Sequence, residues 1–275
     1  MKYFIILVLF LGLVGFIQAQ SLGLGNPRVY KISESVYAIT NLYHTFRYGW
    51  VNAGIIFTAN SVIFIDCGMT EASGEFLWET ASQKMKGKEK IYLILTHSHS
   101  DHIFGMNVLK QKGAKEIAHE LMIDFLKESG EKYKSSLIKE LNWSQEKGDS
   151  IFGEVKLSPP DIVVTKDRIL KINGEDIYIL TSPGHARDQL SVYYPRTKTL
   201  FASDVIYQGG DPTTFFGGPE EWKTWINELK RLKVMDIDII CPGHGNLCRK
   251  DEIDRNIGYL QGYINGITGK VKKDE

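Results

Sequence analysis

The feature that most constrains the fold is a crowd of metal-binding residue types directly after an apolar run. The run Lys90 to Leu95 (KIYLIL) is mostly Ile, Leu and Tyr, and it predicts a buried strand that stops at Thr96. The chain has seven histidines, and three of them fall within six positions beside an aspartate: His97, His99, Asp101 and His102. The fold must therefore contain a strand end where several imidazole and carboxylate groups can point at a common centre.

Further polar residues are expected at the ends of other strands. His185 follows IYILTSPG and His244 follows IDIICPG, so both stand in a Pro-Gly-His turn. Asp66 ends VIFID, and Asp204 ends LFASD. Loops at one edge of a sheet converge in space although they are far apart in the sequence. These four residues are therefore expected to join the cluster at 97–102, which indicates a functional site.

These residue types suit the binding of two metal ions. Neutral imidazole is a good donor to zinc and a carboxylate adds a charged ligand, so six or seven such groups can fill the coordination of two ions and leave a position for water. Two other histidines fit this pattern less well. His119 lies on a predicted helical stripe and is expected to be a hydrogen-bonded structural residue, whereas His44 is either a substrate-side loop residue or a surface one.

Hairpin strands and helices alternate along the chain. Alternating apolar residues and turn signals predict strands at 36–40, 54–57, 61–66, 168–172, 177–180, 190–194, 199–203 and 237–241. Helical spacing predicts helices at 71–84, from Ile117 to Leu126, at 222–232 and at 251–264, with a charged surface helix or lid at 127–149. The predicted fold class is therefore α/β, a four-layer αββα sandwich of two mixed sheets with helices outside.

The N-terminus has the pattern of a signal peptide over residues 1–19. Lys2 is followed by a thirteen-residue apolar run, Phe4 to Phe16, and then by Gln18-Ala19-Gln20. A run this short favours cleavage, and a retained membrane anchor is the alternative. The expected mature protein is a single domain, residues 20–275, that is periplasmic or secreted and has no stable membrane insertion after cleavage.

The charge balance limits the expected classes of partner, and the cysteine count limits the number of disulfides. Thirty-three basic residues balance thirty-three acidic ones, so the net charge favours neither a nucleic acid nor an anionic membrane surface. A small-molecule substrate is the expected partner. The three cysteines, Cys67, Cys241 and Cys248, form at most one disulfide, and we favour free thiols over a bridge between Cys241 and Cys248.

The motifs THSHSDH, SPGH and CPGHG, in this order, resemble the metallo-β-lactamase superfamily over nearly the whole mature chain. The resemblance implies one metal held by His97, His99 and His185, and a second held by Asp101, His102 and His244. It also implies that Asp204 bridges the two ions and that Asp66 ties the loops together without touching metal.

The enzyme implied by the resemblance is a dinuclear zinc hydrolase, with iron or manganese as other possible metals. A water shared by two zinc ions about 3.5 to 4 Å apart has its pKa drawn towards neutrality, so a metal-bridging hydroxide is the expected nucleophile. The expected reaction is hydrolysis of an ester, thioester, lactone or amide. Asp101 is the expected catalytic residue, because it is placed to orient the hydroxide and accept its proton.

Position 204 separates branches of the superfamily. Asp204 resembles hydroxyacylglutathione hydrolases and lactonases, whereas true β-lactamases typically have Cys or Ser there; export nevertheless keeps activity on β-lactams as an alternative. The resemblance also leaves room for a mononuclear iron persulfide dioxygenase and for a non-catalytic exported metal-binding or maturation protein. Ile103 to Gly105 and Ala186 to Asp188 depart from the residues that usually flank the metals, and Phe215 and Phe216 are candidates for an apolar pocket wall.

Overall fold

The computed structural model describes residues 25–42, 50–87 and 89–266. The expected signal peptide at 1–19, His44 and the charged C-terminal tail lie outside the described residues. Among the helices that are described, none is long and apolar enough to span a membrane.

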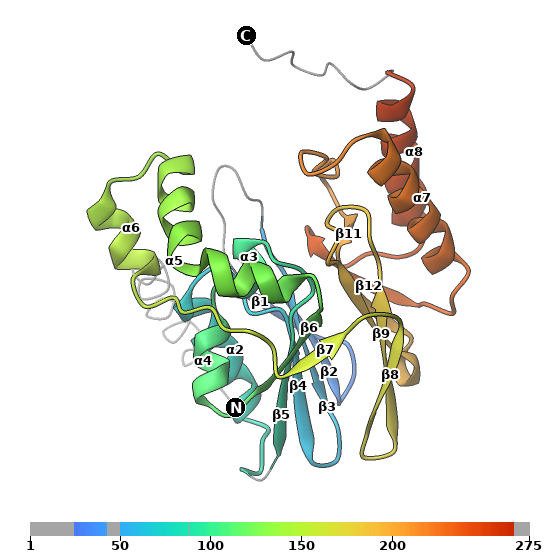
Figure 1. The fold of residues 1–275 in the computed structure, drawn as a ribbon. Helices are drawn as coiled ribbons and strands as arrows, with labels where there is room; N and C mark the ends of the chain where they lie inside the picture. The colour runs from blue at the N-terminus through green and yellow to red at the C-terminus, as the bar shows by residue number, and fades with distance from the viewer. Residues whose placement is uncertain (1–24, 43–49, 88, 267–275) are drawn as a thin grey trace, which may run out of the picture.

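Two sheets lie face to face with helices on both outer sides, as Figure 1 shows. The first sheet has seven strands in chain order, antiparallel from the first to the fourth and parallel from the fourth to the seventh: β1 (Arg28–Lys31), β2 (Val36–Thr40), β3 (Ala53–Phe57), β4 (Ser61–Ile65), β5 (Lys90–Ile94), β6 (Lys115–His119) and β7 (Ile162–Val164). The second sheet has the order β12-β11-β10-β9-β8, with β11 and β12 parallel and the other pairs antiparallel: β8 (Arg168–Ile172), β9 (Glu175–Thr181), β10 (Leu190–Tyr194), β11 (Thr199–Tyr207) and β12 (Ile239–His244).

The helices divide between the two outer layers (Figure 1). The first sheet is covered by α2 (Glu71–Ser82), α3 (Ser100–Ile103), α4 (Met106–Gln111), α5 (Met122–Glu140) and α6 (Gln145–Phe152). The second sheet is covered by α7 (Pro219–Lys233) and α8 (Asp251–Ile264), and a single 3₁₀ turn, Pro195–Thr197, joins β10 to β11.

Alternate residues of the strands face different cores. In β2, Val36 and Ala38 pack between the two sheets, whereas Tyr37 and Ile39 pack under the helices of the first layer. Trp225 of α7 is fully buried in a third core, on the outer face of the second sheet. Because both faces of each sheet are covered, every residue of β2 and β4 is buried. The predicted αββα sandwich is therefore confirmed.

The predicted Asn-Gly hairpin is also confirmed. Ile172 at the end of β8 pairs with Glu175 at the start of β9, so Asn173 and Gly174 alone make the turn. Their φ angles are 54° and 79°. A two-residue turn with positive φ at both positions matches the twist of a hairpin, and Asn-Gly adopts it at little cost.

The predicted helix from Ile117 to Leu126 was wrong at its start. Ile117 lies in strand β6, between β5 and β7, and the helix α5 begins only at Met122. The four-residue spacing from Ile117 to Leu121 imitates a helix, but a short apolar run that is buried on both faces has no diagnostic period. His119 is consequently the last residue of β6, where its Nδ1 accepts a hydrogen bond of 3.2 Å from the Leu121 N–H.

The charged segment that follows is helical, as predicted, but forms two helices, α5 and α6. Leu137 and Ile138 form its buried stripe, with 1% and 5% exposure. The Tyr133 hydroxyl of α5 accepts a 2.8 Å hydrogen bond from the Ser100 N–H, and burial raises the pKa of Tyr133 to about 12. Helix α5 thus fixes the start of the short helix α3, which carries Asp101 and His102.

Two strands of the second sheet end later than predicted. β11 continues past Ser203 to Tyr207, so Asp204 lies inside the strand rather than at its end. The register of β11 and β12 shifts on both sides of Ser203, whose φ is 47°. Such an irregularity lets one strand carry an extra residue and redirect a side chain. β12 likewise runs through Pro242 to His244, which is tolerated because β12 is an edge strand.

Candidate active site

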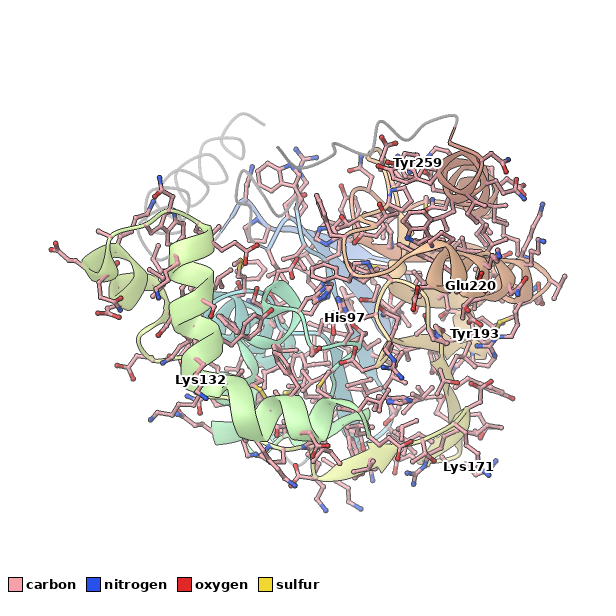
Figure 2. The ribbon with its side chains drawn as sticks, turned by 45° about the horizontal axis from the view of Figure 1, so that its top comes forward. His97, Lys132, Lys171, Tyr193, Glu220 and Tyr259 are labelled. Carbon is pink, nitrogen blue, oxygen red and sulfur yellow. The ribbon has the colours of Figure 1, made fainter. Side chains whose placement is uncertain are left out.

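Loops and strand ends from both sheets bring the seven predicted residues together. His97 and His99 follow β5, Asp101 and His102 lie in α3, His185 follows β9, and the two remaining residues lie in β11 and β12. Their ligand atoms form two groups, and within each group all atoms lie within 4.8 Å of one another: His97, His99, His185 and Asp204; Asp101, His102 and His244. In Figure 2, His97 lies near the centre of the view, with α5 on one side and α7 on the other.

The first group has the spacing of a tetrahedral metal site. His99 Nδ1 lies 3.0 Å from His97 Nε2 and 3.0 Å from His185 Nε2. His185 Nε2 lies 3.3 Å from Asp204 Oδ2. Ligand atoms about 2.0–2.1 Å from a tetrahedral zinc ion are roughly 3.3 Å apart, so one such ion fits between these four side chains.

The second group shares Asp204 with the first. His244 Nε2 lies 3.4 Å from Asp101 Oδ2 and 3.3 Å from Asp204 Oδ2. His102 Nε2 lies 3.8 Å from Asp101 Oδ2 and 3.1 Å from Asp204 Oδ1. One carboxylate oxygen of Asp204 therefore faces ligands of both groups, and the other faces His102.

Hydrogen bonds on the outer side of the histidines orient their rings. The Nδ1 atoms of His102, His185 and His244 lie 2.8, 3.2 and 3.2 Å from the oxygens of Asp66, Thr213 and Trp50, respectively. An Nδ1–H donated outward leaves the Nε2 lone pair pointing at the cluster, which is the tautomer a metal needs.

Two buried atoms of the cluster are left without a hydrogen-bond partner among the described residues, His102 Nε2 and Asp204 Oδ1. They lie 3.1 Å apart without forming a hydrogen bond to each other. Buried polar atoms are rarely left unpaired, and here a cation would supply the missing interaction for both. The residues present therefore fit a bound metal.

The histidines of the first group favour the neutral form. Burial lowers the pKa of His99 to about 4 and that of His185 to about 3, and it holds the pKa of His97 well below its ordinary value. Neutral imidazole is the form that donates to metal. The first group is thus ready to bind an ion without first losing protons near neutral pH.

Two carboxylates, Asp101 and Asp204, act on the histidines of the second group. Burial alone would lower the pKa of His102 and His244, but the carboxylates of Asp204 and Asp101 outweigh it and raise both. Burial would likewise raise the pKa of Asp204, yet the surrounding histidines, His244 foremost, hold it well below its usual range. A divalent cation would replace the protons that His102 and His244 retain.

We expect metal binding to release protons and to strengthen as pH rises. The raised pKa values mean that His102 and His244 still hold protons at pH 6.5, and the metal must displace them; the competition disappears as pH rises through those values. Calorimetric zinc titrations in two buffers of different ionisation enthalpy measure the protons released. The variant His102→Asn should release fewer protons, and equal release by both proteins would contradict the expectation.

Asp66 follows the end of β4 and supports the cluster through hydrogen bonds, although it belongs to neither group of ligand residues. Its Oδ1 accepts a 2.8 Å hydrogen bond from the Thr96 N–H, and its Oδ2 accepts one of 2.8 Å from the Thr96 hydroxyl and lies 2.8 Å from His102 Nδ1. The Ser203 hydroxyl donates to the same Oδ2 at 3.3 Å. One carboxylate thus joins β4, the loop after β5, α3 and β11.

The variant Asp66→Asn is expected to weaken metal affinity by roughly 10–100-fold, because an amide cannot accept all of these hydrogen bonds and His102 loses its orienting partner. Competition with a chelator measures the change. Asp161→Asn is the matched control, since Asp161 Oδ2 also accepts a 2.8 Å hydrogen bond from a backbone N–H, that of Glu116, at the start of β6. An unchanged affinity in Asp66→Asn would contradict the role of this carboxylate.

Close packing explains the glycine in each Pro-Gly-His turn. A Cβ on Gly243 would lie 1.9 Å from Asp204 Oδ1. A Cβ on Gly184, whose φ is 153°, would lie 2.4 Å from the Cβ of Trp225. A side chain at either position would therefore require the turn or these neighbours to shift.

Sequence reasoning missed Tyr207. Its hydroxyl donates to Asp204 Oδ2, its ring stacks on His244 with centroids 5.3 Å apart, and burial raises its pKa well above the usual range. In a regular strand, residues 204 and 207 would point to opposite faces. The irregularity around Ser203 brings them to the same side, and no local sequence signal marks it.

A cleft of about 430 Å³ opens over the cluster. Its walls include His99, Asp101, His185, Asp204 and His244. Phe215 and Phe216, which were candidates for an apolar pocket wall, also line it. All three cysteines are free, as predicted.

The comparisons with known proteins agree with this geometry. The family model of the metallo-beta-lactamase superfamily matches residues 49–244. A metallo-beta-lactamase type 2 of Elizabethkingia meningoseptica is 24% identical over 94% of this chain and 94% of its own length. The probable metallo-hydrolase YqgX of Bacillus subtilis is 26% identical over 59% of this chain and 72% of its own length.

The solved structure of a metallo-beta-lactamase from Pontibacter korlensis has the same fold. It superposes with a TM-score of 0.66 at 21% identity, covering 86% of this chain and 99% of its own. The family model spans most of the chain and includes all seven residues of the two groups. The chain therefore belongs to the metallo-beta-lactamase superfamily and is a metal-dependent hydrolase.

Proposed function

We propose that this protein is an exported hydrolase that holds two zinc ions and cleaves an ester, thioester, lactone or amide bond in a small molecule. The observation that carries the proposal is the position of Asp204. Its Oδ2 lies 3.3 Å from His185 Nε2 in the first group and 3.3 Å from His244 Nε2 in the second. A carboxylate shared in this way supports two ions held side by side.

The donor set favours zinc, because five imidazoles and two carboxylates suit a borderline metal. Iron and manganese accept the same donors and could take the place of zinc. When two such ions are bound, they supply a hydroxide nucleophile near neutral pH and polarise the substrate carbonyl. In the overall reaction, water adds to the carbonyl carbon, the bond to the leaving group breaks, and the leaving group takes up a proton.

We assign the transfer of that proton to Asp101. It lines the cleft, and its Oδ2 lies 3.4 Å from His244 Nε2, which holds the carboxylate in the second group. The Ser100 N–H bonded to Tyr133 anchors the first turn of α3 next to it. A carboxylate held at this point can orient the attacking water and accept its proton. Tyr207, which donates to Asp204, holds the shared carboxylate in position.

Activity on β-lactams is the second candidate function. It is favoured by the similarity over 94% of the chain to a protein named metallo-beta-lactamase type 2. The aspartate at position 204 favours the first candidate, since it adds a hard oxygen ligand between the two groups. Export rests on the residue pattern at 1–19, and it fits either candidate.

Metal content and turnover together test the proposal. The exported form is purified without added metal, its metals are quantified by plasma mass spectrometry, and it is assayed with thioesters, lactones and a chromogenic β-lactam. Two zinc ions per chain with turnover of a thioester or lactone is the expected result. One iron per chain with oxygen-dependent turnover of a persulfide would overturn it, and bound metal with no turnover at all would favour a maturation protein. Turnover of the β-lactam alone would favour the second candidate.

A further inference from the structure

Three exposed aromatic side chains gather at the mouth of the cleft. Phe215 is 88% exposed, Phe216 58% and Trp50 41%, and all three line the cleft above the metal ligands. Large apolar side chains that cluster in solvent beside a concave site mark a binding surface, because covering them with a ligand removes apolar surface from water, which is favourable in free energy.

The loop that carries the two phenylalanines is anchored on the site itself. The Thr213 carbonyl oxygen lies 3.2 Å from His185 Nδ1, and the Arg255 guanidinium of α8 donates to the Gly210 carbonyl. At the far end of the loop, the Gly218 N–H donates a 2.9 Å hydrogen bond to the side chain of Glu221, which lies in the first turn of α7. Phe215 and Phe216 therefore lie between two anchored parts of the loop.

Phe216 stands directly beside the metal ligands. Its ring centroid lies 4.2 Å from that of His99 and 5.8 Å from that of His185. A group bound against Phe216 would thus be adjacent to the carbonyl undergoing hydrolysis.

The described part of the cleft lacks lysine and arginine side chains. None of the described residues that line it is Lys or Arg, and Asp211 adds a carboxylate to the same loop. Arg187 lies in a neighbouring hollow beyond Phe216, together with the carboxylates of Glu220 and Glu221. An anionic group on a substrate would find no lysine or arginine among these described lining residues.

We infer that this site acts on neutral acyl compounds whose acyl group is an aliphatic chain or a ring, and that Phe215 and Phe216 bind that group. The inference rests on the proposed hydrolase function, and it names the substrate class of the same site.

Probe binding tests the inference without turnover. N-phenyl-1-naphthylamine is a neutral fluorescent apolar molecule, and its sulfonate, 1-anilinonaphthalene-8-sulfonate, is the anionic counterpart with the same rings. The full chain is expected to bind the neutral probe at least about fivefold more tightly, and Phe215→Ala and Phe216→Ala are each expected to weaken it by about five- to tenfold. Val234→Ala is the matched control, because Val234 is 84% exposed at the end of α7 and outside the cleft. Equal binding of the two probes, or binding unchanged in both phenylalanine variants, would overturn the inference.

Ester hydrolysis then connects the probe site to the reaction. With metal-loaded protein, kcat/KM for 4-nitrophenyl esters is expected to rise at least about tenfold from acetate to hexanoate, since a fully buried methylene contributes about fourfold. The pentanoate should exceed its size-matched anionic partner, the glutarate monoester, by at least about tenfold, and Phe216→Ala should flatten the chain-length ratio. Turnover with no dependence on chain length would overturn the inference and leave the hydrolase proposal standing. Phenylalanine-dependent probe binding without turnover of any substrate would overturn the hydrolase proposal instead.

Discussion

The variant His97→Ala is expected to lose at least about a thousand-fold in kcat/KM, or about 4 kcal/mol of transition-state stabilisation, while keeping its fold. His97 is fully buried, and its Nε2 lies 3.0 Å from His99 Nδ1, so its loss opens one face of the first group. The three hydrophobic cores contain no ligand residue and should remain packed. Steady-state kinetics measure the loss of kcat/KM, and plasma mass spectrometry measures the metal content. Circular dichroism shows whether the fold is kept.

His119→Asn is the matched control for this variant. His119 is also a buried histidine, but it belongs to neither ligand group, and asparagine retains an acceptor for the Leu121 N–H. We expect its activity to remain within about threefold of the parent, because one neutral hydrogen bond is worth only about 1 kcal/mol. Normal turnover in a well-folded His97→Ala protein would contradict the ligand assignment.

The variant Asp204→Asn is expected to lower the metal content from two ions to one or fewer, with a loss of hydrolysis of about a thousand-fold. An amide keeps the size of the side chain but removes the charge that faces both groups. Since Asp204 lies between four imidazoles, the second ion loses both a ligand atom and electrostatic attraction. Plasma mass spectrometry after dialysis measures the stoichiometry.

Asp188→Asn is the control for removing a buried carboxylate close to the site. Asp188 Oδ2 accepts a 3.0 Å hydrogen bond from the Ser98 N–H, which an amide oxygen can also accept. Burial already raises the pKa of Asp188, so a neutral side chain costs little there. Two tightly bound ions in Asp204→Asn, with full metal content in Asp188→Asn, would show that Asp204 is not shared between the ions.

Local patterns predicted the parts of the fold whose physics is local. Asn173-Gly174 defined its hairpin, because few other residue pairs adopt positive φ twice. Helix α8 begins and ends where its apolar spacing predicted. The prediction failed at Ile117, where burial on both faces removed the period, and at Ser203, where a register shift prolonged β11. Neither the burial of a strand on both faces nor a register shift can be recognised within a short window of sequence.

The sequence by itself determined the chemistry of this protein, because it placed imidazole and carboxylate groups just after apolar runs, where strand ends converge. Only the tertiary structure decided how these groups are shared. Asp204 faces His185 and His244 because the irregular strand β11 turns it inward, and Tyr207 joins it for the same reason. The aromatic mouth of the cleft also depends on contacts between segments that are distant in the chain, such as that of Thr213 with His185. Residue type sets which bonds are possible, whereas the packing of two sheets sets which of them form.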